Sequence, residues 1–135
     1  MNLKTVIICL VILFIHWIAD FVFQTDEMAK GKSKNWDDLL DHTSLYTLVW
    51  AIALMIYGCT YIAINYNNLY DPFTSWAYFA LPITFVCHTA TDYYTSRINA
   101  KLYAEGKIHE FFVSVGFDQL LHFIQLFLTF YLVFK

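Results

Sequence analysis

Four long apolar segments constrain the fold of this chain more than any other feature. They cover residues 3–23, 40–64, 75–95 and 111–134. Each has about the 20 residues that a helix needs to cross the hydrocarbon core of a bilayer. Apolar residues make up 59% of the chain and charged residues only 14%, unlike a soluble domain. The sequence therefore predicts an all-α, polytopic membrane protein, built as a four-transmembrane-helix up-down bundle.

Length and charge narrow the class further. The 135 residues allow a single membrane-embedded helical domain covering 1–135. A net charge of −3 does not indicate a polyanionic partner, so no nucleic acid is expected, and the predicted partner is the lipid bilayer. Cys9, Cys59 and Cys87 all lie in apolar segments. Their odd number argues against a disulfide framework and favours buried thiols.

The basic residues predict the orientation of the bundle. Loops 25–39 and 96–110 carry most of them, namely Lys30, Lys32, Lys34, Arg97, Lys101 and Lys107. The opposite side has Lys4, Lys135 and a predicted turn at residues 65–72 without Lys or Arg. By the positive-inside rule, the two loops are expected in the cytoplasm and both termini outside it.

Ionisable side chains recur inside the apolar segments at helical spacing. Three pairs are four residues apart and should share a helix face. These pairs are His16 with Asp20, His88 with Asp92, and Asp118 with His122. The remaining segment carries His42 near its start. Because the helices alternate in direction, all seven side chains are expected at the cytoplasmic end of the bundle.

A metal site explains this cluster best. A carboxylate at the centre of a bilayer costs about 2.5–3.5 kcal/mol, and no Lys or Arg lies within the predicted spans. Imidazole and carboxylate are ligands for zinc, iron and manganese. The predicted cofactor is one or two divalent ions, Zn, Fe or Mn. Two ions bridged by an Asp and a hydroxide would use every donor, whereas one ion would leave Asp–His pairs around it. A metal-free network of His–Asp hydrogen bonds is the structural alternative.

Other polar residues are assigned supporting roles. Gln24, Ser114 and Gln125 continue the same helical stripes and are predicted to hydrogen-bond the ligands. Lys30 and Arg97 are candidates for contacting an anionic headgroup or phosphate. Asp26 and Asp92 are candidate proton acceptors, and the spacing does not choose between them.

Four stretches together resemble a known family. They are "HWIADFVFQTDEMAKGKSK", "LLDHTSLY", "HTATDYY" and "FDQLLH". Their order resembles a small bacterial and phage membrane family catalogued as domain of unknown function 3307, and the resemblance covers nearly the whole chain. It implies a bacterial inner-membrane location and supports the His/Asp site, with a more distant similarity to membrane-bound metal-dependent hydrolases. The family implies no substrate.

Three functions follow from this pattern. The favoured one is a metal-dependent hydrolase that acts at the cytoplasmic face on a phosphoester or lipid-linked substrate. The alternatives are a proton or metal-ion transporter and a non-enzymatic, metal-stapled phage or host membrane interaction protein. A transport pathway should continue to the far side, but residues 6–15 contain no polar side chain other than a thiol. The cluster therefore has the pattern of a closed pocket, which favours an enzyme.

Overall fold

The computed structural model describes residues 2–64 and 72–133, and over these residues it is built from helices alone. In chain order they are α1 (Leu3–Trp17), a π-helix η1 (Ile18–Val22), α2 (Asp26–Gly31), α3 (Trp36–Ile64), α4 (Pro72–Ala104) and α5 (Ile108–Val133). Residues 65–71 of the predicted turn at 65–72 and the predicted helix end at 134 lie outside the described residues, and Pro72 begins α4. The short helix α2 and the π-helix were not predicted from the sequence.

Local capping contacts set the ends of these helices. Asn35 and Asp38 cap α3 reciprocally: the Asp38 N–H donates to Asn35 Oδ1 and the Asn35 amide donates to Asp38 Oδ2, both at 2.8 Å. Gly106, with a φ of 70°, ends α4 in the left-handed conformation that favours glycine. The Lys107 N–H then bonds back to the Leu102 carbonyl at 3.0 Å. These caps lie in the polar loops, so α3, α4 and α5 extend beyond the apolar segments.

The π-helix continues α1 without a break. Its wider turn is closed by the Phe23 N–H, which donates to the Ile18 carbonyl five residues earlier at 3.0 Å. Single π turns occur often at functional sites. Here the π turn carries Asp20, which is 3% exposed, into the interior.

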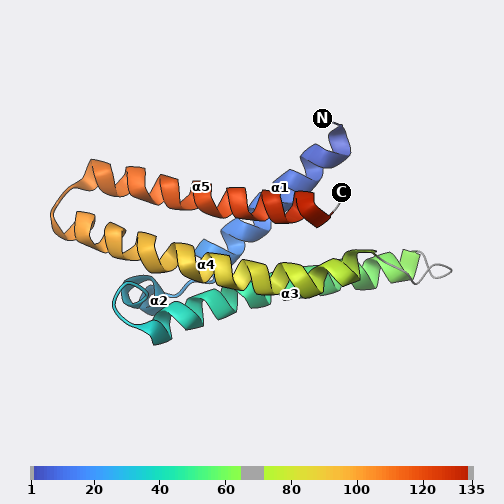
Figure 1. The fold of residues 1–135 in the computed structure, drawn as a ribbon, viewed down its shortest axis with the longest axis horizontal. Helices are drawn as coiled ribbons and strands as arrows, with labels where there is room; N and C mark the ends of the chain where they lie inside the picture. Colours follow the sequence, from blue (N-terminus) through green and yellow to red (C-terminus); the bar gives the residue numbers. More distant parts are fainter. Residues whose placement is uncertain (1, 65–71, 134–135) are drawn as a thin grey trace.

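The long helices pack into one bundle around α4. Helix α4 packs against both α3 and α5, while α1 leans across and contacts α3 and α5. In Figure 1 the N and C termini lie at one end, and α2 with the α4–α5 turn lies at the other. This placement agrees with the alternating helix directions expected from the sequence.

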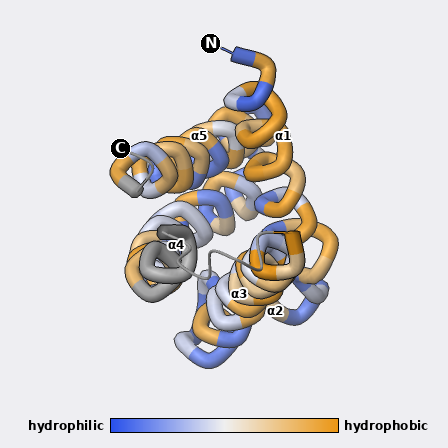
Figure 2. Tube along the Cα trace, turned by 90° about the vertical axis from the view of Figure 1, so that its right-hand side faces the viewer, coloured by the Kyte–Doolittle hydropathy of each residue, from blue (hydrophilic) through white to orange (hydrophobic). Residues whose placement is uncertain are grey.

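The distribution of polar and apolar side chains is the reverse of that in a soluble protein. Large apolar side chains such as Leu3, Phe79 and Leu132 are more than 70% exposed, while His42, His88 and Asp92 are at most 1% exposed. Figure 2 shows apolar residues along the outside of α1, α3 and α5. Within residues 2–64 and 72–133, three helical segments are long and apolar enough to cross a membrane: Leu3–Val22, Trp36–Ile64 and Ile108–Leu132. The predicted count of four spans is not confirmed, because the more polar α4 is not among these three.

Candidate metal centre

The predicted His and Asp side chains come together in the interior of the bundle. His16 lies in the last turn of α1 and Asp20 in η1; His42 comes from α3, His88 and Asp92 from α4, and Asp118 and His122 from α5. All seven are buried. Five helical elements, α1 with its continuation η1, α3, α4 and α5, therefore converge on one polar cluster, as the spacing and topology predicted.

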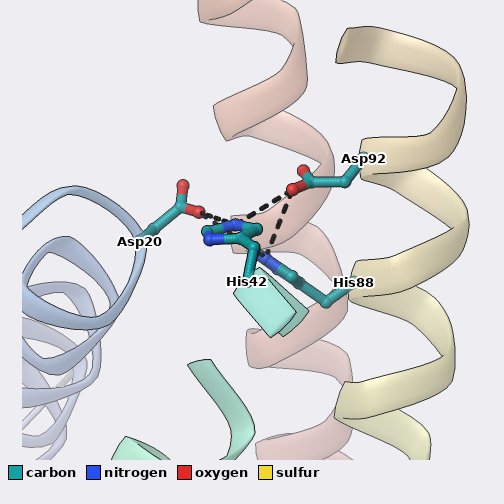
Figure 3. Close-up of side chains that lie close together, drawn as sticks. All are labelled: Asp20, His42, His88 and Asp92. Atoms are coloured by element: carbon teal, nitrogen blue, oxygen red, sulfur yellow. Dashed lines mark hydrogen bonds and ion pairs between the residues drawn. The ribbon is translucent and has the colours of Figure 1, made fainter. Parts of the chain in front are cut away.

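Four of these residues form a compact donor group, which we call the inner group: Asp20, His42, His88 and Asp92. In Figure 3 their polar atoms point toward one another. His42 Nε2 lies 3.0 Å from Asp92 Oδ2, 3.2 Å from Asp20 Oδ1 and 3.2 Å from His88 Nε2. His88 Nε2 lies 3.5 Å from Asp20 Oδ1 and 3.7 Å from Asp92 Oδ2.

These separations match a metal coordination shell. Four ligands bound tetrahedrally at 2.0–2.1 Å lie about 3.3 Å from one another. The five donor–donor distances above bracket that value. The inner group thus has the donor types, the number and the spacing that a divalent cation requires.

A second group shares one carboxylate with the first. Asp20, Asp118 and His122 have ligand atoms within 4.8 Å of one another. Asp92 also faces both groups, since its Oδ1 lies 3.2 Å from His122 Nε2 while its Oδ2 faces His42. Asp20 and Asp92 are therefore placed as bridging carboxylates would be.

A buried oxygen in the cluster supports a cation there. Asp20 Oδ1 is buried and accepts no hydrogen bond of acceptable geometry, although it faces two imidazole nitrogens. A buried carboxylate oxygen without a donor is costly. A cation between this oxygen and the imidazole lone pairs would satisfy all of them together.

His16 is the one predicted ligand that the structure brings into neither group. Its Nδ1 lies 2.8 Å from the Tyr46 hydroxyl and its Nε2 lies 2.9 Å from Gln119 Oε1. The Gln119 amide donates onward to Asp20 Oδ2 at 2.9 Å and to Asp118 Oδ2 at 3.1 Å. With His16 neutral, every hydrogen bond in this series, from Tyr46 through His16 and Gln119 to the carboxylates, has one donor and one acceptor. In this structure His16 therefore orients the carboxylates through Gln119.

Tyr46 and Gln119 were not predicted as site residues. The Tyr46 ring also stacks on the His88 imidazole, with centroids 3.7 Å apart, and the Thr95 hydroxyl donates to Asp118 Oδ1. Tyr46 lies four residues after His42, a spacing that could have pointed to it. Gln119 follows Asp118 directly, and adjacent residues do not share a helix face.

Lys32 was assigned only to topology, yet it reaches the inner group. Its Nζ donates to Asp92 Oδ2 at 2.9 Å and lies 3.5 Å from His42 Nε2, and its side chain is 15% exposed. Burial lowers the pKa of the Lys32 ammonium, but the carboxylates of Asp92 and Asp20 more than offset this effect and hold that pKa above its ordinary value. No Lys or Arg lies within the predicted spans, but Lys32 reaches Asp92 from the loop before α3.

The charged candidate residues in the predicted loops, Asp26, Lys30 and Arg97, lie away from the His/Asp cluster. Asp26 is 96% exposed at its side chain and pairs with Lys30 at 3.2 Å. Arg97 folds over the Tyr93 ring at 3.7 Å and donates to the Tyr93 carbonyl. The structure thus brings Asp92, but not Asp26, Lys30 or Arg97, into the cluster.

The three predicted hydrogen-bond partners also lie outside the network described above. Gln125 donates to Thr84 Oγ1 at 3.3 Å and Thr129 Oγ1 at 3.0 Å. Gln24 has a buried Nε2 without a hydrogen-bond partner, and Ser114 is half-buried on α5.

Fold and site together define a class: an all-helical protein with candidate membrane spans around buried His/Asp groups that could hold a metal ion. Residues 8–135 match the family model described as "Protein of unknown function (DUF3307)", and the chain belongs to that family. No curated protein and no solved structure matches the chain. The family assignment predicted from the sequence is confirmed; the distant similarity to membrane-bound hydrolases is not.

Proposed function

We propose that this protein is a metal-dependent hydrolase of the bacterial inner membrane, acting on a phosphoester or lipid-linked substrate at the cytoplasmic face. The observation that carries the proposal is the inner group, whose donor atoms have the spacing of a coordination shell and share Asp20 with a second group. Purely structural metals are usually enclosed by protein ligands. Two adjacent groups with a shared carboxylate are instead the arrangement of two-metal hydrolytic sites.

The proposed topology is four spans, with α4 as the fourth. Its 33 residues make a helix of about 50 Å, and Asp92 faces the interior rather than lipid. The loops that hold α2 and Gly106 carry the basic residues and are assigned to the cytoplasm. The site then lies near the cytoplasmic headgroups.

Each residue has a proposed role. Asp20, His42, His88 and Asp92 would hold one divalent ion, and Asp118 and His122, together with Asp20, would hold a second. The ions would supply hydroxide at neutral pH by lowering the pKa of bound water to about 7. Asp92 is the retained candidate proton acceptor.

Lys32 replaces Lys30 and Arg97 as the proposed contact for the substrate anion. Its ammonium lies 2.9 Å from Asp92 Oδ2, so an anion beside the inner group would be within its reach. Two divalent ions and Lys32 together exceed the charge of the three carboxylates, which suits an anionic phosphoester.

A hydrolysis assay tests the proposal. Protein loaded with zinc, iron or manganese is given an aryl phosphate, an aryl phosphodiester and a short-chain phospholipid. We expect turnover of at least one substrate, and we expect His42→Ala to lower kcat/KM about 100-fold or more. The control is His109→Ala, which removes the same side chain from an exposed position. Loss of activity in both variants, or equal activity in both, would contradict the assignment.

A further inference from the structure

The bundle contains a largely apolar, partly open cavity that the proposed chemistry does not use. Its volume is about 440 Å³, and α1, α3, α4 and α5 all line it. Figure 2 views the protein from the end where the termini lie, with these four helices arranged around a common axis. The walls include Ile8, Leu54, Leu81 and Phe130, and Lys4 lies at the terminal end. We call this space the chamber.

The inner end of the chamber adjoins the His/Asp cluster on every helix. Helices α1, α4 and α5 each contribute a chamber residue that lies four positions, or about one helical turn, from a residue of the cluster: Ile12 from His16, Thr84 from His88, and Leu126 from His122. On α3, Trp50 lies four positions from Tyr46, whose ring stacks on His88. The chamber therefore begins about one helical turn from the cluster.

The size and polarity of the chamber limit what can occupy it. Its volume falls within the range of about 300–1,000 Å³ found for ligand sites. Apolar cavities exclude water and bind apolar molecules, and the cost of an empty cavity grows with its volume. A helix is about 10–12 Å wide, so roughly one helical turn would fill the chamber and a helix of a second copy does not fit. A hydrocarbon chain is narrow enough, and the bilayer supplies such chains directly.

We propose that the chamber binds one hydrocarbon tail of a membrane lipid, with the polar end of that lipid at the His/Asp cluster. A lipid from the cytoplasmic leaflet would then lie with its headgroup beside Lys32 and its tail extending past Ile12 toward Lys4. That the headgroup is the substrate rests on the proposed function. The binding of a tail does not.

Lipid retention tests the chamber. Full-length protein is purified in detergent, washed extensively and analysed for bound lipid and for metal by mass spectrometry. Ala53→Phe and Ala80→Phe place a ring in the chamber from α3 and α4. Ala63→Phe makes the same change on an exposed face of α3. We expect stoichiometric lipid in wild type and Ala63→Phe, and several-fold less in both chamber variants.

Crosslinking tests the direction of the tail in wild-type protein, so the result does not depend on a variant folding. A phospholipid with a diazirine at the end of its acyl chain should label residues near Lys4, and one with a diazirine near the ester should label residues near Ile12. The reverse pattern would overturn the proposed direction. Equal lipid retention in all variants, or none in wild type, would overturn the chamber site. Lipid retained without bound metal would support lipid binding in the chamber and contradict the proposed metal-dependent hydrolase.

Discussion

At the residue scale, the His/Asp cluster depends on side chains that spacing alone did not identify. The four-residue spacing predicted the His88–Asp92 and Asp118–His122 pairs, because such residues share a helix face. Gln119 was not predicted because it follows Asp118 directly, yet its long side chain crosses to η1 and bonds Asp20. Contacts of this kind depend on how two helices pack against each other. The spacing of residues along a single sequence does not reveal this packing.

Replacing Gln119 with leucine should weaken the metal site without removing a ligand. Gln119→Leu deprives Asp20 and Asp118 of an amide donor and His16 of an acceptor. Loss of such orienting bonds usually lowers metal affinity about 10–100-fold, which competition with a chelator would measure. Gln24→Leu is the matched control, because the Gln24 Nε2 has no hydrogen-bond partner. Similar losses in both variants would show that the bonds of Gln119 are not the cause.

Lys32 should matter most when no metal is bound. Lys32→Met leaves the buried Asp92 carboxylate without its cation, and removal of one partner of a buried ion pair commonly costs about 3–5 kcal/mol. A bound divalent ion compensates the same carboxylate. We therefore expect a clear loss of thermal stability in metal-free protein and a smaller loss after metal is added.

Thermal unfolding in detergent, with and without metal, measures this difference. Lys34→Met is the control, since Lys34 is exposed in the same loop. An equal loss with and without metal would contradict the idea that Lys32 and a cation compensate the same carboxylates.

At the scale of the elements, hydropathy located the long helices but not their ends. The apolar segments mark where a helix meets lipid, whereas the helix continues until a cap stops it. Helix α3 starts at Trp36, after its Asn35 cap, and α4 runs to Ala104, close to Gly106. The predicted start at residue 40 and the predicted end at residue 95 therefore made these two helices too short. The π turn at Ile18–Val22 was missed because its sequence is as apolar as the α-helix before it.

The position of α2 should control the position of Lys32. A Cβ on Gly31 would clash with the Asp38 carboxylate, so Gly31→Ala must displace either α2 or the side chain that caps α3. We expect a loss of about 1–3 kcal/mol in the free energy of unfolding. A Cβ on Gly116 meets nothing within 4 Å, so Gly116→Ala should be neutral or slightly stabilising. Reversible denaturation of both variants would measure the difference, and equal effects would contradict close packing at Gly31.

At the scale of the whole molecule, the bundle keeps ionisable groups inside and apolar surface outside. The sequence predicted this arrangement because four apolar segments with alternating directions place all seven side chains at one end. It did not predict the chamber, since a cavity depends on how side chains from four helices pack. Nor did it predict that His16 would bond Tyr46 and Gln119 rather than join a donor group. The cluster as a whole could be predicted, but the task of each residue within it could not.

Metal content tests the central claim most directly. Detergent-purified protein, reconstituted with zinc, iron or manganese, is measured by plasma mass spectrometry. We expect about two equivalents in wild type and in the exposed control His109→Ala. His88 belongs to the inner group and Asp118 to the other, while Asp20 belongs to both. His88→Ala and Asp118→Ala should therefore each lower the content, and Asp20→Asn should lower it most. Absence of metal in reconstituted wild type, or full metal content in Asp20→Asn, would contradict a shared His/Asp metal centre.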